Sequence, residues 1–555
     1  MLFKQVLSKE NIKLLGVITW MLSSACILYF FDDEIAFSVS LKVLTVSLIF
    51  SVCFFIIYIF SPIKIRALRI FLSLLAIVPT MLVVSGFSVT GAILNRGDFR
   101  VFFTTDQTES LEFIEQFLDF KVVALTLCYI IPLFLFFIIK PVKPAIDNSK
   151  KRLIVAFSII SLFLLCITNW KLVSKRYHVV GFYRSYYNFK KSQELYHLEA
   201  VRGSLRFEDK VVSELRIKKP KTFVVIIGEA LSRYHMQLYG YQRETNPRLN
   251  AIKDDLYIFR DAVSPATATV EVMKYILTLA EHQHPEYFLQ KRSIVNLFND
   301  AGYDTVWVGN QGFKGNKYNI SHGVIARECA KSYEIAYKND QAAVDALSMT
   351  LRIRPEMDRV VFLHLRGSHT KYTERYTEDF DYFDHRRIPL PYGGNLSEDD
   401  KTIIDEYDNS VRYNDYIISS IIDIVKAKSE YSWVLYFPDH AEEVFEYRDL
   451  FGHQIRNFSR YMCEIPFMLW VSDKYKAANS DIFKNLQLYC NRPFSTENVI
   501  HSISVLSKLK FADLDLSKSV FSAKFKERPR FVNGKPYGEV PPLKYASKPE
   551  KKNEQ

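Results

Sequence analysis

Five long apolar stretches near the start of this 555-residue chain limit what it can fold into more than any other feature does. They run roughly over residues 12–31, 41–60, 70–94, 122–139 and 153–170. A helix that crosses a bilayer needs ~20 apolar residues, and each stretch is close to that length. We therefore expect residues 1–172 to form a transmembrane domain of five helices. A cleaved signal peptide does not fit the first stretch, because it is long and further spans follow it.

The charges between the stretches orient them in the membrane. Lys and Arg gather in residues 1–13, 64–69 and 140–152, whereas residues 32–34 are Asp-Asp-Glu. Because Lys and Arg are enriched on the cytoplasmic side, these loops place the N-terminus in the cytoplasm and everything after the fifth stretch outside it. Three basic residues in 171–176 go against this pattern, but the three consistent loops outweigh them.

The composition changes after the fifth stretch. Residues 173–218 form a polar, tyrosine-rich connector that suits either a helix at the membrane interface or an ordinary linker. Residues 219–525 have the composition of a globular domain, and residues 526–555 read as a polar, Pro-containing tail. Only three cysteines follow the spans, so at most one internal disulfide is available and the core must hold the domain. The net charge of +11 suits an anionic membrane surface, and we find no nucleic-acid motif.

Short apolar runs predict the fold of the globular domain. The clearest are "TFVVIIG" (222–228), "DTVWVGN" (304–310), "RVVFLHLRG" (359–367) and "SWVLYFP" (432–438). Runs without polar alternation are typical of strands buried on both faces, as in a parallel sheet covered by helices. Helical patterns, such as residues 292–301 and 413–428, lie between the runs. The pattern therefore predicts an α/β/α sandwich.

Residues with ligand chemistry follow the predicted strands, and in open α/β sheets the working residues gather past the carboxyl ends of the strands. The four runs lead to Glu229, to Asn310 and Lys314, to His369, and to Asp439 and His440. Asp439 and His440 are adjacent, so one turn can present both to a single cation. With Glu229 they form a carboxylate and imidazole set that suits Zn²⁺, with Mn²⁺ as the alternative.

Other polar residues nearby have a simpler structural interpretation. His235 and His364 are expected to pack or to hydrogen-bond inside the fold rather than to bind a metal. Glu442 and Glu443 follow the predicted ligands and are expected to lie in the outer shell of the site or in solvent, because three ligands and a hydroxyl already fill a tetrahedral site.

Two threonines, Thr267 and Thr269, precede the helical pattern in "SPATATVEVMKYILTLA". A hydroxyl beside a bound metal loses its proton more easily and can attack a phosphate, which the N-terminus of a helix also favours. The alternative is helix capping, the commonest role of threonine at that position.

Four motifs stand in order behind the apolar stretches: "VVIIGEALSRYHMQLYGYQRETNPRL", "TATVEVMKYILTLA", "HLRGSHTKY" and "FPDHAEEV". Together they resemble the bacterial phosphoethanolamine transferases that modify lipopolysaccharide, which are inner-membrane members of the alkaline phosphatase and sulfatase superfamily. The similarity is nearest to the branch that decorates the heptose core, and it spans the chain. It implies a monomeric, multi-pass inner-membrane enzyme with its catalytic domain in the periplasm.

The resemblance assigns a nucleophile and metal ligands. It makes Thr269, rather than Thr267, the residue that accepts the phosphoethanolamine group. Glu229, Asp439 and His440 would hold zinc together with the Thr269 oxygen.

The resemblance also assigns residues around the substrate. His369 and His453, the latter in "LFGHQ", match histidines that contact the phosphate or a second zinc, and one of them would serve as acid or base. Asn310 and Lys314 match residues that line the donor pocket, where a lysine can neutralise phosphate charge.

The chain departs from the family pattern at two small residues. Ala441 replaces the glycine of the usual "DHG", so this turn must avoid a conformation that only glycine adopts. Ala230 replaces a Ser or Thr, which removes a hydroxyl near the metal.

The implied reaction moves phosphoethanolamine from phosphatidylethanolamine to Thr269 and then to a lipopolysaccharide sugar, either core heptose or the lipid A region. Membrane-spanning helices suit it, because donor and acceptor are both lipids. One alternative is a phosphoglycerol transferase that uses phosphatidylglycerol, and another is an inactive, membrane-anchored binding protein.

Overall fold

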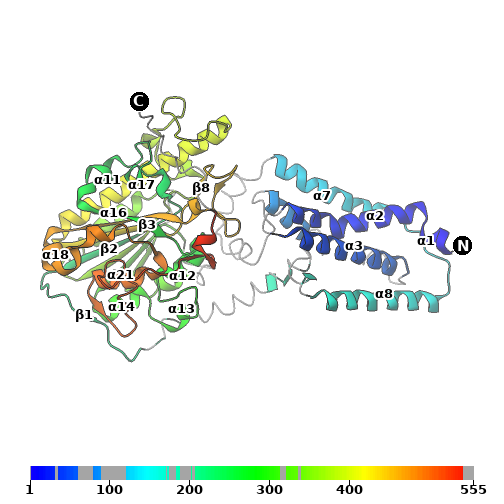
Figure 1. The fold of residues 1–555 in the computed structure, drawn as a ribbon, viewed down its shortest axis with the longest axis horizontal. Coiled ribbons are helices and arrows are strands. Elements are labelled where there is room, and N and C mark those ends of the chain that lie inside the picture. The colour runs from blue at the N-terminus through cyan, green and yellow to red at the C-terminus, as the bar shows by residue number, and fades with distance from the viewer. Residues whose placement is uncertain are drawn as a thin grey trace, which may run out of the picture. The chain divides into compact units, whose positions relative to one another are not determined.

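The computed structural model describes residues 2–31, 35–60, 79–88, 120–170, 207–312, 321–335 and 339–541, with a few single positions between 172 and 205. The chain divides into two compact units, residues 1–193 and 194–555 (Figure 1). We describe each unit by itself.

Long apolar helices build the first unit. Its main helices are α1 (Leu2–Val6), α2 (Lys9–Ser23), α3 (Phe37–Phe60), α7 (Phe120–Ile138) and α8 (Asn148–Thr168). A 3-10 segment extends α2 to Phe30. Among the described residues, three helices are long and apolar enough to cross a membrane: Lys9–Phe30, Phe37–Phe60 and Asn148–Thr168.

These three helices coincide with the first, second and fifth predicted spans. The fourth prediction coincides with α7. The third, residues 70–94, lies outside the described residues except for a short apolar helix at Pro79–Ser88. The count of five therefore stays a prediction.

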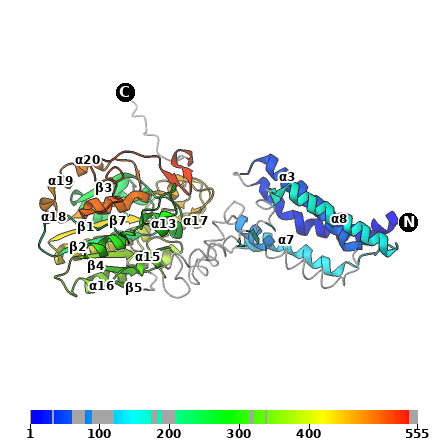
Figure 2. The ribbon, with the colours of Figure 1, turned by 90° about the horizontal axis from the view of Figure 1, so that it is seen from below.

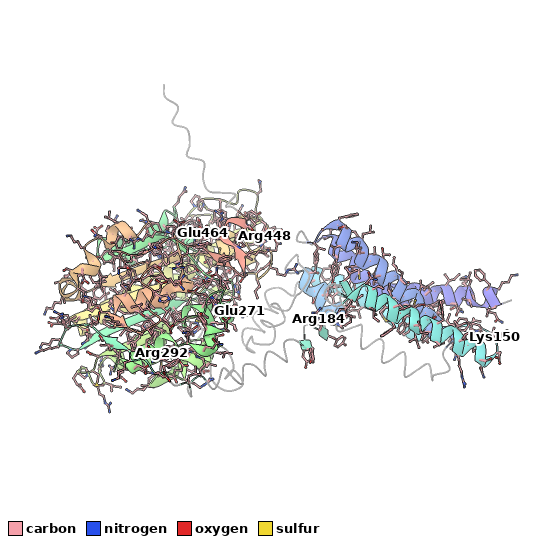
Figure 3. The ribbon with its side chains drawn as sticks, turned by 60° about the horizontal axis from the view of Figure 1, so that its bottom comes forward. Lys150, Arg184, Glu271, Arg292, Arg448 and Glu464 are labelled. Atoms are coloured by element: carbon pink, nitrogen blue, oxygen red, sulfur yellow. The ribbon has the colours of Figure 1, made fainter. Side chains whose placement is uncertain are left out.

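A buried asparagine joins the start of α2 to the loop after α7. Asn11 Nδ2 donates to Val142 O and Asn11 Oδ1 accepts from Val142 N, both at 2.9 Å. A buried amide needs such partners, and this pair satisfies both of its ends. The basic loop that continues to Lys150 in the first turn of α8 is thus fixed to α2 (Figure 3).

An eight-stranded mixed sheet forms the centre of the second unit, in the order β11-β3-β10-β7-β2-β6-β4-β5 (Figure 2). Its strands are β2 (Lys221–Gly228), β3 (Leu256–Val263), β4 (Asp304–Gly309), β5 (Lys331–Glu334), β6 (Arg359–His364), β7 (Tyr431–Pro438), β10 (Glu464–Val471) and β11 (Phe494–Ser495). The four predicted runs are β2, β4, β6 and β7, which lie together and parallel at its centre. The sheet is mixed because β10 runs antiparallel to both β7 and β3.

Helices cover both faces of the sheet. They are α11 (Pro247–Ala251), α12 (Thr269–Ile276), α13 (Tyr287–Gln290), α14 (Ile294–Asp300), α15 (Ser321–Ala326), α16 (Gln341–Thr350), α17 (Glu398–Lys428), α18 (Asp473–Ala478), α19 (Ser480–Phe483), α20 (Leu486–Tyr489) and α21 (Val499–Leu506). One buried apolar cluster packs α12, α14 and α21 on one face, and a second packs α11, α16 and α17 on the other (Figure 1). Alternate side chains of β2 enter the two clusters, which explains why its sequence lacks polar alternation.

Three short strand pairs complete the unit: β1 (Val212–Ser213) with β12 (Leu509–Lys510), β8 (Glu443–Val444) with β9 (Phe451–Gly452), and β13 (Phe531–Val532) with β14 (Lys535–Pro536). The last pair falls in the predicted polar tail. Val532 and Val540 are buried with Phe458 and Met462, so residues 531–540 pack on the domain. Two valines in a Lys- and Pro-rich segment were too weak an apolar signal to reveal this.

Candidate metal centre and nucleophile

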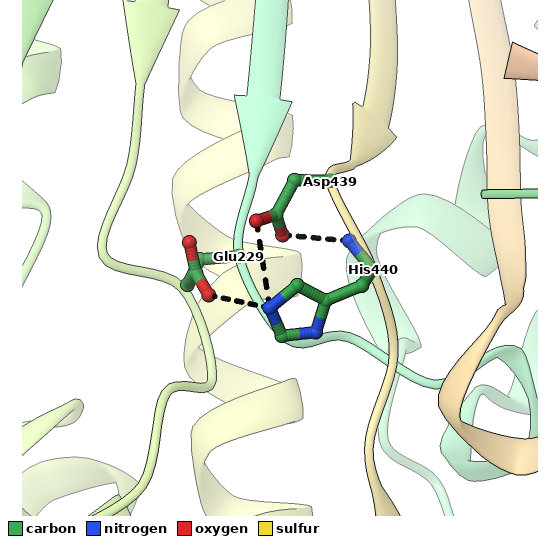
Figure 4. A group of neighbouring side chains, drawn as sticks. All are labelled: Glu229, Asp439 and His440. Atoms are coloured by element: carbon green, nitrogen blue, oxygen red, sulfur yellow. Dashed lines mark hydrogen bonds and ion pairs between the residues drawn. The ribbon is translucent and has the colours of Figure 1, made fainter. Parts of the chain in front are cut away.

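The predicted metal ligands leave the sheet at one edge. Strands β2 and β7 are parallel neighbours in which Gly228 is paired with Pro438. The next residues, Glu229 and Asp439, are therefore adjacent in space, and His440 follows directly (Figure 4). All three side chains are fully buried. Each offers a ligand atom within 4.8 Å of the others.

Two atoms of this group make no hydrogen bond with any described residue: Asp439 Oδ2 and His440 Nε2. His440 Nδ1 lies 3.1 Å from Ala441 O, in position to donate to it. His440 Nε2 then faces Glu229 Oε1 at 3.2 Å and Asp439 Oδ2 at 3.5 Å. Three electron-rich atoms that converge in a buried space are stable only around a proton or a cation.

The charge of the group points to a divalent cation. Burial and the neighbouring Glu229 carboxylate raise the pKa of Asp439 to about 7. Two carboxylates and an imidazole are a donor set typical of zinc, and two negative charges balance one divalent ion. The residues present therefore fit the metal that the sequence predicted.

The predicted nucleophile lies beside this group. Thr269 is the first residue of α12, and its Oγ1 lies 3.3 Å from Glu229 Oε1 and 3.2 Å from Glu229 Oε2. Thr267 turns elsewhere: its Oγ1 donates to Gln454 O at 2.6 Å. The structure thus separates the two threonines and brings only Thr269 to the ligands.

A glutamine that the sequence reasoning overlooked orients Glu229. Gln311 Nε2 donates to Glu229 Oε2 at 2.5 Å and to Leu365 O at 3.1 Å. Gln311 directly follows Asn310 at the carboxyl end of β4, so the strand-end rule that selected Asn310 could have found it. Its amide occupies one carboxylate oxygen of Glu229, while Oε1 faces His440.

The two departures from the family pattern have different structural outcomes. Ala441 is buried and is not among the residues with positive φ, so the turn does avoid a glycine-only conformation. Ala230 has a φ of +57°, which costs an alanine roughly 1–2 kcal/mol. Tyr407 holds it there, because its hydroxyl donates to Ala230 O and accepts from Ser232 N, both at 2.8 Å.

The two other predicted histidines also lie near the group. The ring centroid of His453 is 4.1 Å from that of His440 and 6.2 Å from that of His369. His453 Nδ1 lies 3.0 Å from Glu442 Oε1, and Glu442 also accepts from the Tyr372 hydroxyl. Glu442 is therefore an outer-shell residue but not a solvated one.

Glu443 is buried as well, and it bonds to Ser459 and to Arg448, which is labelled in Figure 3. Of the two expected positions, the outer shell of the site or solvent, burial excludes solvent for Glu443. A buried carboxylate is retained when such partners satisfy it.

The predicted donor-pocket residues differ in what the structure describes. Asn310 is buried, and its Nδ2 donates to Asp340 Oδ1 at 2.8 Å and to Asn339 O at 3.0 Å. Asp340 in turn accepts from the backbone of Gly367, which packs against Glu229. Asn310 therefore supports the loop behind the ligands. Lys314 lies outside the described residues.

His235 belongs to a separate buried group, as expected for a residue that is not a metal ligand. Its Nδ1 lies 2.6 Å from Asp408 Oδ1 and its Nε2 lies 3.0 Å from Glu446 Oε1. Burial opposes its protonation, but the two carboxylates outweigh burial and raise its pKa to about 9. Asp408 also bonds to Arg243 and Tyr241.

Comparison with known proteins places the second unit in a described family. The match to the sulfatase family model covers residues 221–504, which are just over half of the chain. The phosphoethanolamine transferase EptC of Escherichia coli O18:K1:H7 is 28% identical over an alignment of 523 residues, and the alignment covers 88% of each chain.

Solved structures give the same relationship. The C-terminal periplasmic domain of Escherichia coli EptC, in complex with zinc, is 30% identical with a TM-score of 0.56 and covers 61% of this chain and 98% of that one. The integral membrane lipooligosaccharide phosphoethanolamine transferase A of Neisseria meningitidis is 18% identical, with a TM-score of 0.65 over 92% of this chain and 97% of that one. At that identity the second likeness concerns the fold alone, and it includes helices of the first unit.

Proposed function

We propose that this chain, which belongs to the phosphoethanolamine transferases of the sulfatase family, transfers phosphoethanolamine from phosphatidylethanolamine to a lipopolysaccharide sugar through a phosphothreonine at Thr269. One observation carries the proposal: the Thr269 hydroxyl lies 3.2–3.3 Å from the carboxylate of Glu229, which forms a buried three-residue metal group with Asp439 and His440.

The enzyme is an integral membrane protein with a periplasmic catalytic domain, and we propose five spans in the bacterial inner membrane. We further propose core heptose as the first acceptor to test, with the lipid A region as the other candidate. Spanning helices keep the domain at the surface where both lipids reside. We expect it to act as a monomer.

We propose zinc as the metal, held by Glu229, Asp439 and His440 beside Thr269. A bound zinc ion would lower the pKa of the threonine hydroxyl and offset negative charge on the phosphoryl oxygens. Gln311 would keep the Glu229 carboxylate in the orientation that the ligand set requires.

In the first half of the reaction, Thr269 Oγ1 attacks the phosphorus of the donor. A bond forms between that oxygen and phosphorus, and the bond from phosphorus to the glycerol oxygen breaks. The Thr269 hydroxyl gives up its proton in this step, and the glycerol oxygen takes up one as it leaves as diacylglycerol. Because Thr269 lies in the first turn of α12, a phosphoryl group on its oxygen would lie near the backbone N–H groups at the start of that helix.

In the second half, a hydroxyl of the acceptor sugar attacks the same phosphorus, the bond from phosphorus to Thr269 Oγ1 breaks, and Oγ1 takes up a proton to restore the hydroxyl. The acceptor hydroxyl must lose a proton. His453 is suited to take it, because Glu442 holds its Nδ1 and leaves Nε2 as the nitrogen that exchanges a proton. His369 and Lys314 are proposed to contact the transferred phosphate.

The direct test uses the purified full-length protein with labelled phosphatidylethanolamine. We expect release of diacylglycerol and a phosphoethanolamine adduct on the peptide that contains Thr269, detected by mass spectrometry. Thr269→Ala should abolish both, whereas Thr267→Ala should retain the adduct.

Other outcomes would reject the proposal. Release of diacylglycerol from phosphatidylglycerol alone would make the protein a phosphoglycerol transferase. Absence of both stoichiometric zinc and turnover would make it an inactive binding protein. Mass spectrometry of lipopolysaccharide from cells with and without the protein would locate the acceptor.

A further inference from the structure

A β-hairpin near the end of the described chain contacts two loops. The Thr269 loop, residues 265–268, leads to Thr269 at the start of α12, and the His453 loop, residues 453–456, contains His453. Strands β13 and β14 are joined by Asn533 and Gly534, whose φ angles are +50° and +79°. Positive φ at both central positions is the requirement of a tight type I′ hairpin, and Asn-Gly is a preferred pair for it. The turn points the Asn533 side chain at residues far away in sequence.

Asn533 bonds to both loops at once. On the nucleophile side, its Oδ1 accepts from Thr267 N at 3.2 Å, its Nδ2 donates to Thr267 Oγ1 at 2.7 Å, and its own N donates to Pro265 O at 3.0 Å. On the histidine side, Nδ2 donates to Ile455 O at 2.9 Å. Thr267 completes the tie by donating to Gln454 O.

All of these contacts except the one to Pro265 lie within two residues of Thr269 or His453. Thr267 is two residues before Thr269, and Gln454 directly follows His453. A shift of about 1 Å in such a loop can lower a rate by ~100-fold, because attack requires near contact between the reacting atoms. The side-chain amide therefore has the means to set how Thr269 and His453 approach the same phosphorus.

The hairpin does not need this amide in order to stay in place. Val532 and Val540 are buried in their own apolar cluster with Val263 and Phe458. The Tyr537 hydroxyl donates to Glu464, which is labelled in Figure 3. Anchoring of the hairpin and bonding to the two loops are thus made by different residues.

We propose that Asn533 is a positioning residue that holds the Thr269 loop and the His453 loop in register for the transfer reaction. This inference rests on the proposed function, since it assigns Thr269 and His453 to one reaction. It gives residues 531–536 a positioning role in the reaction that their sequence alone did not suggest.

The test compares Asn533→Gly with wild type in the full-length protein. Glycine keeps the positive φ without strain, so only the side-chain bonds are lost. We expect kcat to fall by roughly 10- to 100-fold while KM for phosphatidylethanolamine and bound zinc stay unchanged. Hydrogen exchange should accelerate at residues 266–269 and 453–456 and stay unchanged at residues 229–231. Glu539→Ala, an exposed change in the same segment, is the matched control and should alter none of these.

Two more variants show whether the bonds themselves matter. Asn533→Asp keeps the acceptor for Thr267 N but places an oxygen against Ile455 O, so it should not rescue kcat. Thr267→Val in the Asn533→Gly background should lower kcat less than it does alone, because both changes break the same tie.

Unchanged kcat in Asn533→Gly, or unchanged exchange in both loops, would overturn the inference. A fall in kcat that comes with lost zinc or faster exchange throughout the domain would overturn it too, because the role would then be structural. The exchange measurement needs no substrate. If the wild-type protein transfers nothing, the proposed function fails while the tie between the loops is still tested.

Discussion

Two buried groups in the catalytic unit contain the same residue types but differ in their hydrogen-bond partners and in how their charge is balanced. Each contains one histidine and two carboxylates: Glu229, Asp439 and His440 in the metal group, and His235, Asp408 and Glu446 in what we call the His235 group. In the His235 group the imidazole bridges both carboxylates, and Arg243 adds a second positive charge. In the metal group, Asp439 Oδ2 and His440 Nε2 have no hydrogen-bond partner among the described residues.

The comparison teaches that residue types alone do not identify a metal site. In the His235 group, the carboxylates of Asp408 and Glu446 raise the pKa of His235 to about 9, so the protonated imidazole balances part of their negative charge. In the metal group, burial and the neighbouring Glu229 carboxylate raise the pKa of Asp439 to about 7 instead. Two ligand atoms without a described hydrogen-bond partner and unbalanced charge distinguish the candidate metal group from the His235 group.

The largest expected effect comes from Asp439→Asn. Loss of a ligand should lower zinc content and reduce transfer by about 10³-fold or more, since a catalytic metal supplies several kcal/mol. The metal-free variant should unfold with the same or a higher free energy than metal-free wild type, because the lost charge was buried beside Glu229. Metal analysis and chemical denaturation measure both quantities. A less stable metal-free variant would show that Asp439 is structural, as Asp408 is.

Asp408→Asn should produce the opposite result. It removes one acceptor from His235, Arg243 and Tyr241 and leaves buried positive charge poorly paired. We expect the free energy of unfolding to fall by about 3–5 kcal/mol, with zinc per folded molecule unchanged. Loss of zinc without loss of stability would erase the distinction between the two groups.

The smallest effect is a dependence of stability on pH. The pKa of His235 is about 9 in the folded protein and about 6.5 in an unfolded chain. Its protonation therefore stabilises the fold fully below about pH 6.5, and this contribution, about 3 kcal/mol, is lost as pH rises through 9. Denaturation of the zinc-loaded protein at pH 6.5 and 9.5 measures it. The same decline in Asp408→Asn would assign the dependence to another residue.

The sequence predicted the central strands, and the grouping of Glu229, Asp439 and His440 past their ends, because both follow from local rules. An apolar run without alternation marks a buried strand, and the residue after a parallel strand lies at the shared carboxyl edge. Glu229, Asp439 and His440 satisfy these rules directly. The mixed character of the sheet was not predictable in this way, because β10 differs from its neighbours in direction and not in composition.

Residues that act through distant contacts were missed or misplaced. Gln311 has an ordinary position in the sequence, and its role depends on its contact with Glu229. Asn533 bonds to Thr267 across 266 residues, and its segment looked like a tail. Its Asn-Gly pair was still a hairpin signal, which the surrounding Lys and Pro residues obscured.

The hairpin also has a consequence for how the enzyme is made. Synthesis reaches Ile455 78 residues before Asn533, and it reaches Thr267 266 residues before. At ~5–20 residues per second, roughly 4–16 s pass between the synthesis of Ile455 and that of Asn533. Roughly 13–53 s pass between the synthesis of Thr267 and that of Asn533. By the time synthesis reaches Asn533, both loops have already been made. If Asn533 acts as proposed, the tie that positions Thr269 and His453 for the reaction therefore forms only after both loops have been synthesised.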